Sequence, residues 1–232
     1  MRRRAVVSVV LVAVASLTAC SKSSSNPTTL PTPTAGGSCT PSAAPSSATY
    51  HSPPATLPAA PADLSTARPP WLPPAVINQG AQSAAFVAAA GLPYGEEMLS
   101  VHYHAHLDIN ADGKAVAVPP YIGYVIKCAK PVGLAPLHTH QQDGIIHIEN
   151  SAPATFVLGQ FFIEWGVRLS ADCVGGLCAG KGKELAFFVN GKRVAGDPAA
   201  IVLHKHDEIA IEYGDTGKLP KPPSSFAFPD GV

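Results

Sequence analysis

The chain has 232 residues, of which 46% are hydrophobic and only 14% charged, with 16 basic and 16 acidic residues in balance. This length accommodates one domain of ordinary size beside non-globular segments. Beyond the first few residues the sequence has no block of Lys and Arg. Nucleic acid is therefore excluded as a partner, because phosphate binding requires clustered basic side chains.

The N-terminus has the order of a secretory signal. Three arginines at positions 2–4 precede an apolar run over residues 5–17, which is short for a membrane-spanning helix of roughly 20 residues. The run ends in Leu17-Thr18-Ala19-Cys20, which resembles the lipobox of prokaryotic membrane lipoproteins. The resemblance implies that residues 1–19 are a signal peptide, that Cys20 carries acyl chains such as palmitate, and that lipid anchors the mature chain extracytoplasmically to the cell membrane. The alternative is an ordinary secretory signal with an incidental cysteine.

Residues 20–74 predict a tether. Of the 24 prolines in the chain, 13 lie between residues 21 and 74, among runs of Ser and Thr. This composition offers too little apolar surface to offset the entropy of folding, and proline keeps the chain extended. Trp71 and Leu72 indicate where packing begins, and residues 75–232 form one His-rich β domain.

The domain contains many short strand patterns in chain order. Alanine-rich residues 75–90 predict a helix that ends at Gly91, and the alternation over residues 101–109 predicts a strand. Further elements are a hairpin from 101–109 to 115–118, strands at 121–126, 144–149 and 155–158, a short helix at 161–165 closed by Gly166, a hairpin over 185–195 and a last strand at 209–213. The pattern predicts a mostly β fold, an antiparallel sandwich or small barrel with one or two short helices, and a β-grasp-like α+β fold is the alternative.

Five cysteines are present. With Cys20 acylated, the remaining four favour disulfides in an oxidising compartment. The preferred bridge is Cys173–Cys178, with Cys39–Cys128 second. A zinc thiolate site ranks below both, since Cys-x4-Cys departs from the usual Cys-x2-Cys spacing.

The histidines are unevenly distributed, with eight of nine between residues 102 and 206. His102, His104 and His106 alternate, so they share one face of a strand together with Asp108. Three such histidines span roughly 13 Å and cannot all reach one ion, so one of them supports the others or two ions are bound. The spacing recurs downstream, and a turn at residues 141–144 brings the later pairs together. The predicted metal ligands are His102, His104, His106, His138, His140, His147 and Glu149.

Neutral imidazole with carboxylate suits Zn(II), Cu(II) or non-haem Fe(II), and zinc or copper is the expected metal. Met98 is the only methionine after residue 19, which disfavours a methionine-rich Cu(I) carrier. Two metal-free alternatives are a buried histidine network satisfied by its own hydrogen bonds and a pH-responsive surface. The sequence His204-Lys205-His206 beside two acids predicts a solvated turn.

Three segments resemble a group of secreted His-rich bacterial and archaeal proteins: residues 102–108, 136–149 and 158–166. The resemblance extends over roughly residues 95–215 and implies no particular activity. The His138-Thr139-His140 segment is also similar to copper monooxygenases of the peptidylglycine type, and the clustered histidines with glutamate are similar to cupins. These short matches add only to the expectation of a metal.

Three functions are compatible with these patterns. The first is a metal-binding module of the cell envelope that captures or delivers zinc or copper. The second is a metalloenzyme, an oxygenase or hydrolase, with the same ligands and with Glu149 or Asp108 as the base. The third is a tethered interaction domain in which the histidines are structural. The sequence contains neither Gly-x-Ser-x-Gly nor His-Glu-x-x-His, so no familiar catalytic motif decides among them.

Overall fold

The structure is a computed structural model that describes residues 59–77, 81–128 and 130–232. The predicted signal peptide, Cys20 and most of the predicted tether lie outside these residues. Cys39 does too, so the predicted Cys39–Cys128 bridge stays a prediction. Within the described ranges, no helix combines the length and the hydrophobicity needed to cross a membrane.

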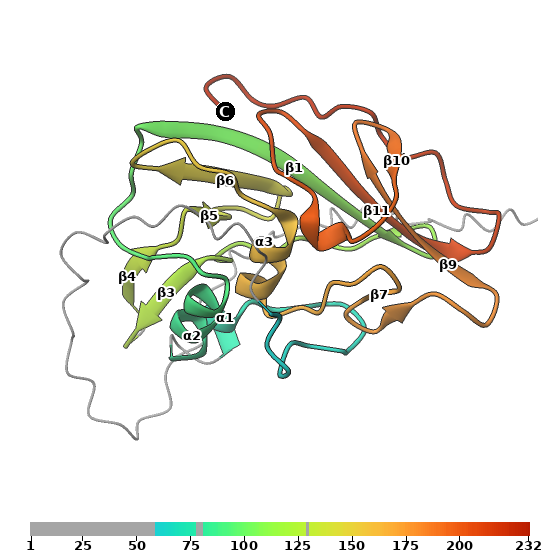
Figure 1. The fold of residues 1–232 in the computed structure, drawn as a ribbon, viewed down its shortest axis with the longest axis horizontal. Coiled ribbons are helices and arrows are strands. Elements are labelled where there is room, and N and C mark those ends of the chain that lie inside the picture. Colours follow the sequence, from blue (N-terminus) through green and yellow to red (C-terminus); the bar gives the residue numbers. More distant parts are fainter. Residues whose placement is uncertain (1–58, 78–80, 129) are drawn as a thin grey trace, which may run out of the picture.

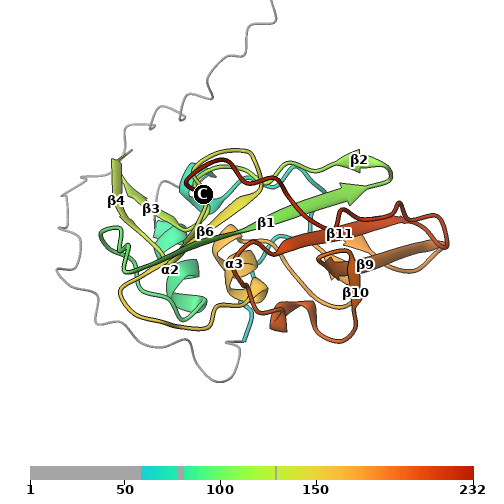
Figure 2. The ribbon, with the colours of Figure 1, turned by 90° about the horizontal axis from the view of Figure 1, so that it is seen from above.

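A mixed sheet of seven strands organises the domain (Figure 1). Its order is β10-β9-β11-β1-β6-β5, with β2 paired to the end of β1. Strand β1 runs antiparallel to β6 and parallel to β11, and Figure 2 shows β1 between them. The strands are β1 Val101–Ala111, β2 Lys114–Ala115, β5 Leu137–His138, β6 Ile145–Asn150, β9 Lys183–Val189, β10 Lys192–Val194 and β11 Glu208–Asp215.

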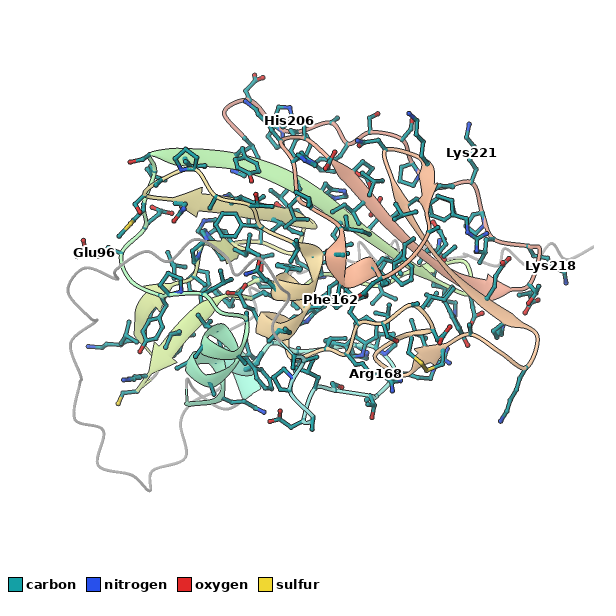
Figure 3. All side chains as sticks on the ribbon, viewed as in Figure 1. Glu96, Phe162, Arg168, His206, Lys218 and Lys221 are labelled. Carbon is teal, nitrogen blue, oxygen red and sulfur yellow. A yellow bond between two sulfur atoms is a disulfide. The ribbon has the colours of Figure 1, made fainter. Side chains whose placement is uncertain are left out.

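Two hairpins stand apart from this sheet. One pairs β3 (Tyr124–Lys127) with β4 (Lys130–Leu134), and the other pairs β7 (Cys173–Val174) with β8 (Leu177–Cys178). The predicted Cys173–Cys178 disulfide is confirmed and closes the second hairpin. The Arg168 guanidinium donates a hydrogen bond of 3.1 Å to the Cys178 sulfur, near the Arg168 label in Figure 3.

The helices are short. They are α1 (Pro74–Ile77), α2 (Ala81–Ala89), α3 (Leu158–Trp165) and the 3-10 turn η1 (Pro198–Ala200). Helix α3 ends at Gly166, whose φ of 76° places it in the left-handed region, as the sequence predicts. The predicted strand at 155–158 is reduced to an antiparallel bridge between Val157 and Val202, because α3 begins at Leu158. The Val157 amide also donates to the side-chain oxygen of Gln160 at 3.1 Å.

The hydrophobic core lies between the sheet and α3, every residue of which is buried. On β1, Ala105, Leu107 and Ile109 face this core, while the alternate positions face the opposite side. Phe162 of α3 packs in the interior, and His206 lies beyond the far side of the sheet (Figure 3). The C-terminal segment passes over β1 on the side away from α3 (Figure 1).

The end of the predicted tether packs against the domain. Leu64 and Trp71 are buried, whereas Leu72 is 55% exposed. The Trp71 ring meets Trp165 edge-on with 5.6 Å between ring centroids, and Trp165 Nε1 donates to the Trp71 carbonyl at 3.1 Å. Residues 59–74 therefore contribute to the folded unit that holds the histidines.

The prediction of a mostly β chain with short helices is confirmed. The sheet is open, since β10 and β5 are its edges, so it is not a closed barrel. The parallel β1–β11 pair makes the sheet mixed rather than purely antiparallel.

Candidate metal centre

Strand register assembles the histidines into one cluster. In the β1–β6 pair, His104 lies opposite His147 and His102 lies opposite Glu149. In the β5–β6 pair, His138 also lies opposite His147. Paired residues on neighbouring strands point to the same face about 4.8 Å apart. Five predicted ligands from three strands therefore meet on the face away from α3, and His140, two residues beyond His138, joins them.

The first group of close ligand atoms is site A, formed by His102, His104, His147 and Glu149. Its four closest atom pairs are 3.1 Å (His102 Nε2 to His104 Nε2), 3.1 Å (His104 Nε2 to His147 Nδ1), 3.3 Å (His102 Nε2 to Glu149 Oε1) and 3.5 Å (His147 Nδ1 to Glu149 Oε1). A tetrahedral zinc ion bound at 2.0–2.1 Å keeps its ligand atoms about 3.3 Å apart. Site A has the spacing of a tetrahedral ligand shell.

Hydrogen bonds alone satisfy site A poorly. A neutral imidazole nitrogen carries either a hydrogen or a lone pair, not both. His104 Nε2 lies 3.1 Å from two other ring nitrogens, so it cannot donate to one and accept from the other. The four contacts form a closed circuit of three ring nitrogens and one carboxylate oxygen. If no two N–H groups are to face each other, at most two of these four atoms carry a hydrogen. A cation satisfies all four lone pairs at once, which favours a metal over the metal-free network.

The second group is site B, formed by His138, His140, His147 and Glu149. His138 Nε2 lies 3.2 Å from His140 Nε2 and 3.8 Å from Glu149 Oε2. One ligand atom from each of the four residues lies within 4.8 Å of the others. His147 and Glu149 are therefore common to both sites.

Hydrogen bonds at Nδ1 orient the rings of His138 and His140 in site B. His138 Nδ1 donates to the Ala135 carbonyl at 2.9 Å, which leaves the lone pair on Nε2 pointing into the cluster. His140 Nδ1 shares a hydrogen bond of 2.6 Å with the Tyr124 hydroxyl. Metal-binding histidines usually make such a bond with the nitrogen that does not face the ion. The support extends to Gly123, with φ of 75°, where a Cβ would collide with the Leu137 carbonyl oxygen and lie 2.9 Å from His138 Cβ.

Burial favours the neutral form of three of the rings. Burial lowers the pKa of His104 and of His138 to about 4 each, and burial also lowers the pKa of His140. Burial works against ionisation of Glu149, but the His147 hydrogen bond and the surrounding histidines lower its pKa below the usual value. Near neutral pH the cluster thus combines imidazole lone pairs with a carboxylate, which is the donor set that zinc and Cu(II) accept.

His106 shares the face but makes different contacts. Its Nδ1 lies 2.7 Å from Glu208 Oε2 and its Nε2 lies 2.9 Å from the Asp143 carbonyl oxygen, so both nitrogens have oxygen partners. Burial alone would lower the pKa of His106, but the Glu208 hydrogen bond and charge raise it. The Phe226 ring stacks on His106 with 3.6 Å between ring centroids. The structure therefore places His106 in a buried ion pair outside sites A and B, although it also falls in a third group of close ligand atoms with Asp108 and Glu208.

Two residues near the cluster escaped the sequence reasoning. Besides Tyr124, Glu97 from the segment before β1 places Oε1 3.9 Å from His140 Nε2. Burial and the neighbouring Glu149 raise the pKa of Glu97. A cavity of about 30 Å³ borders Glu97, Met98, His138 and Glu149, and this volume suits one or two water molecules. The available signal was the acidic pair Glu96-Glu97, which precedes the histidine-bearing strand β1 by a few residues.

The remaining histidines of the domain belong to none of the groups of close ligand atoms, although the His206 amide donates to the His104 carbonyl at 2.7 Å. His204 and His206 are exposed on the turn before β11, and His204 Nδ1 lies 3.2 Å from Asp207 Oδ2. His206 stacks with Phe228 of the C-terminal segment, with 4.7 Å between ring centroids.

Comparisons of the chain with family models, with curated proteins and with solved structures each found no match.

Proposed function

We propose that this protein is a lipid-anchored, extracytoplasmic metal-binding protein that holds zinc or copper in its histidine cluster. The observation that carries the proposal is site A, where three imidazole nitrogens and one carboxylate oxygen converge at separations of 3.1 to 3.5 Å. These separations suit one tetrahedral ion.

The location is inferred from the N-terminal sequence. The lipobox-like Leu17-Thr18-Ala19-Cys20 supports acylation of Cys20, and the proline-rich segment after it supports a spacer between membrane and domain. In that setting the cluster meets the metals of the cell envelope rather than those of the cytoplasm.

A binding module has more support than an enzyme that acts on an organic substrate. Site A supplies four donor atoms, which fill a tetrahedral shell without a substrate or water. An oxygenase or hydrolase requires an open coordination position on the ion.

Metal analysis tests the proposal. The full chain, purified and exposed to Zn²⁺ or Cu²⁺ and then desalted, is expected to retain at least one ion, and His104→Ala is expected to lose the ion at site A. The matched control is His204→Ala, because the His204 side chain is 72% exposed and belongs to none of the groups of close ligand atoms. A chain that retains neither metal, and whose melting temperature neither metal raises, would contradict metal binding.

The anchor is tested separately. Cells fed an alkyne analogue of palmitate are expected to label the wild-type chain and to retain it in the membrane fraction. The Cys20→Ala variant is expected to remain unlabelled. Equal labelling of both chains would place the acyl group elsewhere, and no labelling of either would contradict the lipoprotein assignment.

A further inference from the structure

The two oxygens of Glu149 face different groups of histidines. Oε1 lies 3.3 Å from His102 Nε2 and 3.5 Å from His147 Nδ1, on the side of site A. Oε2 faces His138 Nε2 at 3.8 Å, on the side of site B. The Glu149 side chain is only 4% exposed. Among the described residues, its Oε2 has no hydrogen-bond partner. A buried carboxylate oxygen that has no hydrogen-bond partner and faces the His138 imidazole supports a cation between these two groups.

One ion does not account for the cluster. A tetrahedral ion takes four donor atoms, whereas the cluster supplies five imidazoles and a carboxylate with two oxygens. The mutually close atoms fall into two groups, one with His102 and His104 and the other with His138 and His140. His102 and His104 lie on β1, whereas His138 and His140 lie at and just after the end of β5. The two pairs therefore approach Glu149 from different strands.

We propose that sites A and B hold two divalent ions side by side, bridged by the carboxylate of Glu149. His102, His104 and His147 Nδ1 complete the coordination of the ion at site A, and His138 and His140 bind the ion at site B. This inference rests on the proposed metal-binding function and adds a second ion to it. The carboxylate bridge corresponds to the separation of about 3.5–4 Å that is usual for two-metal sites.

The second ion has an exchangeable position. Because His147 Nδ1 is assigned to the ion at site A, His138, His140 and Glu149 Oε2 supply three donor atoms to the ion at site B. His140 Nε2 lies 3.9 Å from Glu97, and the water-sized cavity borders Glu97, His138 and Glu149. The Glu97 side chain is 44% exposed, so water reaches this position. Tyr124, through its 2.6 Å bond to His140, is a positioning residue for the second ion.

The test uses the full chain, stripped by chelation and reloaded with Zn²⁺ or Cu²⁺ alone. Wild type is expected to bind two ions per chain, and His140→Ala and His102→Ala are each expected to bind one. The two side chains are about one-third exposed, at 33% and 37%, so their removal leaves little of the core disturbed. Electron paramagnetic resonance adds an independent readout. The Cu²⁺ pair in wild type is expected to show magnetic coupling, whereas each variant shows the signal of an isolated Cu²⁺ ion.

The outcomes separate this inference from the function on which it rests. One ion in wild type, or two in His140→Ala, overturns the second site while metal binding stands, and no ion in any chain overturns both. If His140→Ala fails to fold, Tyr124→Phe replaces it, since that variant keeps every ligand. It is expected to weaken binding of the second ion by about 10–100-fold while the first remains unchanged. Equal weakening of both ions, or of neither, would overturn the assignment of Tyr124 to site B.

Discussion

Replacement of Glu212 by glutamine provides a quantitative test of how the face away from α3 is built. Glu212 lies on β11 opposite Asn110 of β1 and is only 4% exposed. Its Oε2 has no hydrogen-bond partner within the described part of the chain. Burial, followed by the negative charge of Asp108, raises the pKa of Glu212 from 4.5 to about 7. The folded state therefore binds this proton more tightly than the unfolded chain does.

The magnitude follows from the two pKa values of 4.5 and about 7. Each tenfold difference is worth about 1.4 kcal/mol, so ionisation of Glu212 costs the folded state about 3 kcal/mol. Because the folded pKa is raised, the contribution to stability is fully present below about pH 4.5 and is lost as the pH rises to about 7. Glutamine has the same shape and no charge, so it removes this pH dependence.

The assay is urea denaturation of the full chain at pH 5 and pH 8 with excess chelator, so that bound metal makes no contribution. Glu212→Gln is expected to be more stable than wild type by about 2–3 kcal/mol at pH 8 and by less than about 1 kcal/mol at pH 5. The exposed Glu96→Gln is the matched control and is expected to change neither value. If Glu212→Gln loses stability at pH 8, or keeps the wild-type difference between the two pH values, the reasoning about this buried carboxyl is refuted.

Three further substitutions test other parts of the account. His106→Ala leaves Glu208 buried without its partner at 2.7 Å. It is expected to lower the free energy of unfolding by about 3–5 kcal/mol in denaturation experiments and to retain the wild-type number of zinc ions. Loss of zinc would make His106 a ligand. Gly123→Ala places a methyl group against the Leu137 carbonyl oxygen at a φ of 75°. It is expected to lower both the melting temperature and zinc binding at site B. An unchanged variant would show that β5 shifts to make room for the methyl group without loss of stability. The Cys173→Ser, Cys178→Ser double variant opens a short loop with a sequence separation of 5 and is expected to lower the free energy of unfolding by about 2 kcal/mol, without effect on metal content; a loss of metal would tie the hairpin to the cluster.

Local patterns in the sequence predict much of the fold. The alternation from Val101 to Ile109 determines which side chains of β1 share a face, and it placed His102 and His104 together correctly. Gly166 marks the end of α3, and Asn190-Gly191 marks the β9–β10 hairpin. In each of these cases the cause lies within a few residues, so it is visible in the sequence.

The contacts that define the site depend on pairing between distant segments. His104 meets His147 through the β1–β6 register across 43 residues, and His106 meets Glu208 across 102 residues. The same alternation that groups His106 with His104 cannot reveal that β11 supplies it with a carboxylate. Glu97 and Tyr124 join the cluster from irregular or separate elements, where no periodicity indicates direction. Sequence patterns thus predict faces, while strand register decides which faces meet.

X-ray absorption at the zinc edge tests the central claim most directly, because it reports the atoms around the bound ion. For the zinc-loaded full chain we expect nitrogen and oxygen neighbours at about 2.0–2.1 Å, with the outer-shell scattering of several imidazole rings. His104→Ala and His147→Ala are expected to reduce the imidazole contribution or the zinc content. A sulfur neighbour at about 2.3 Å, or a spectrum unchanged in both variants, would contradict a metal centre built from this histidine cluster and Glu149.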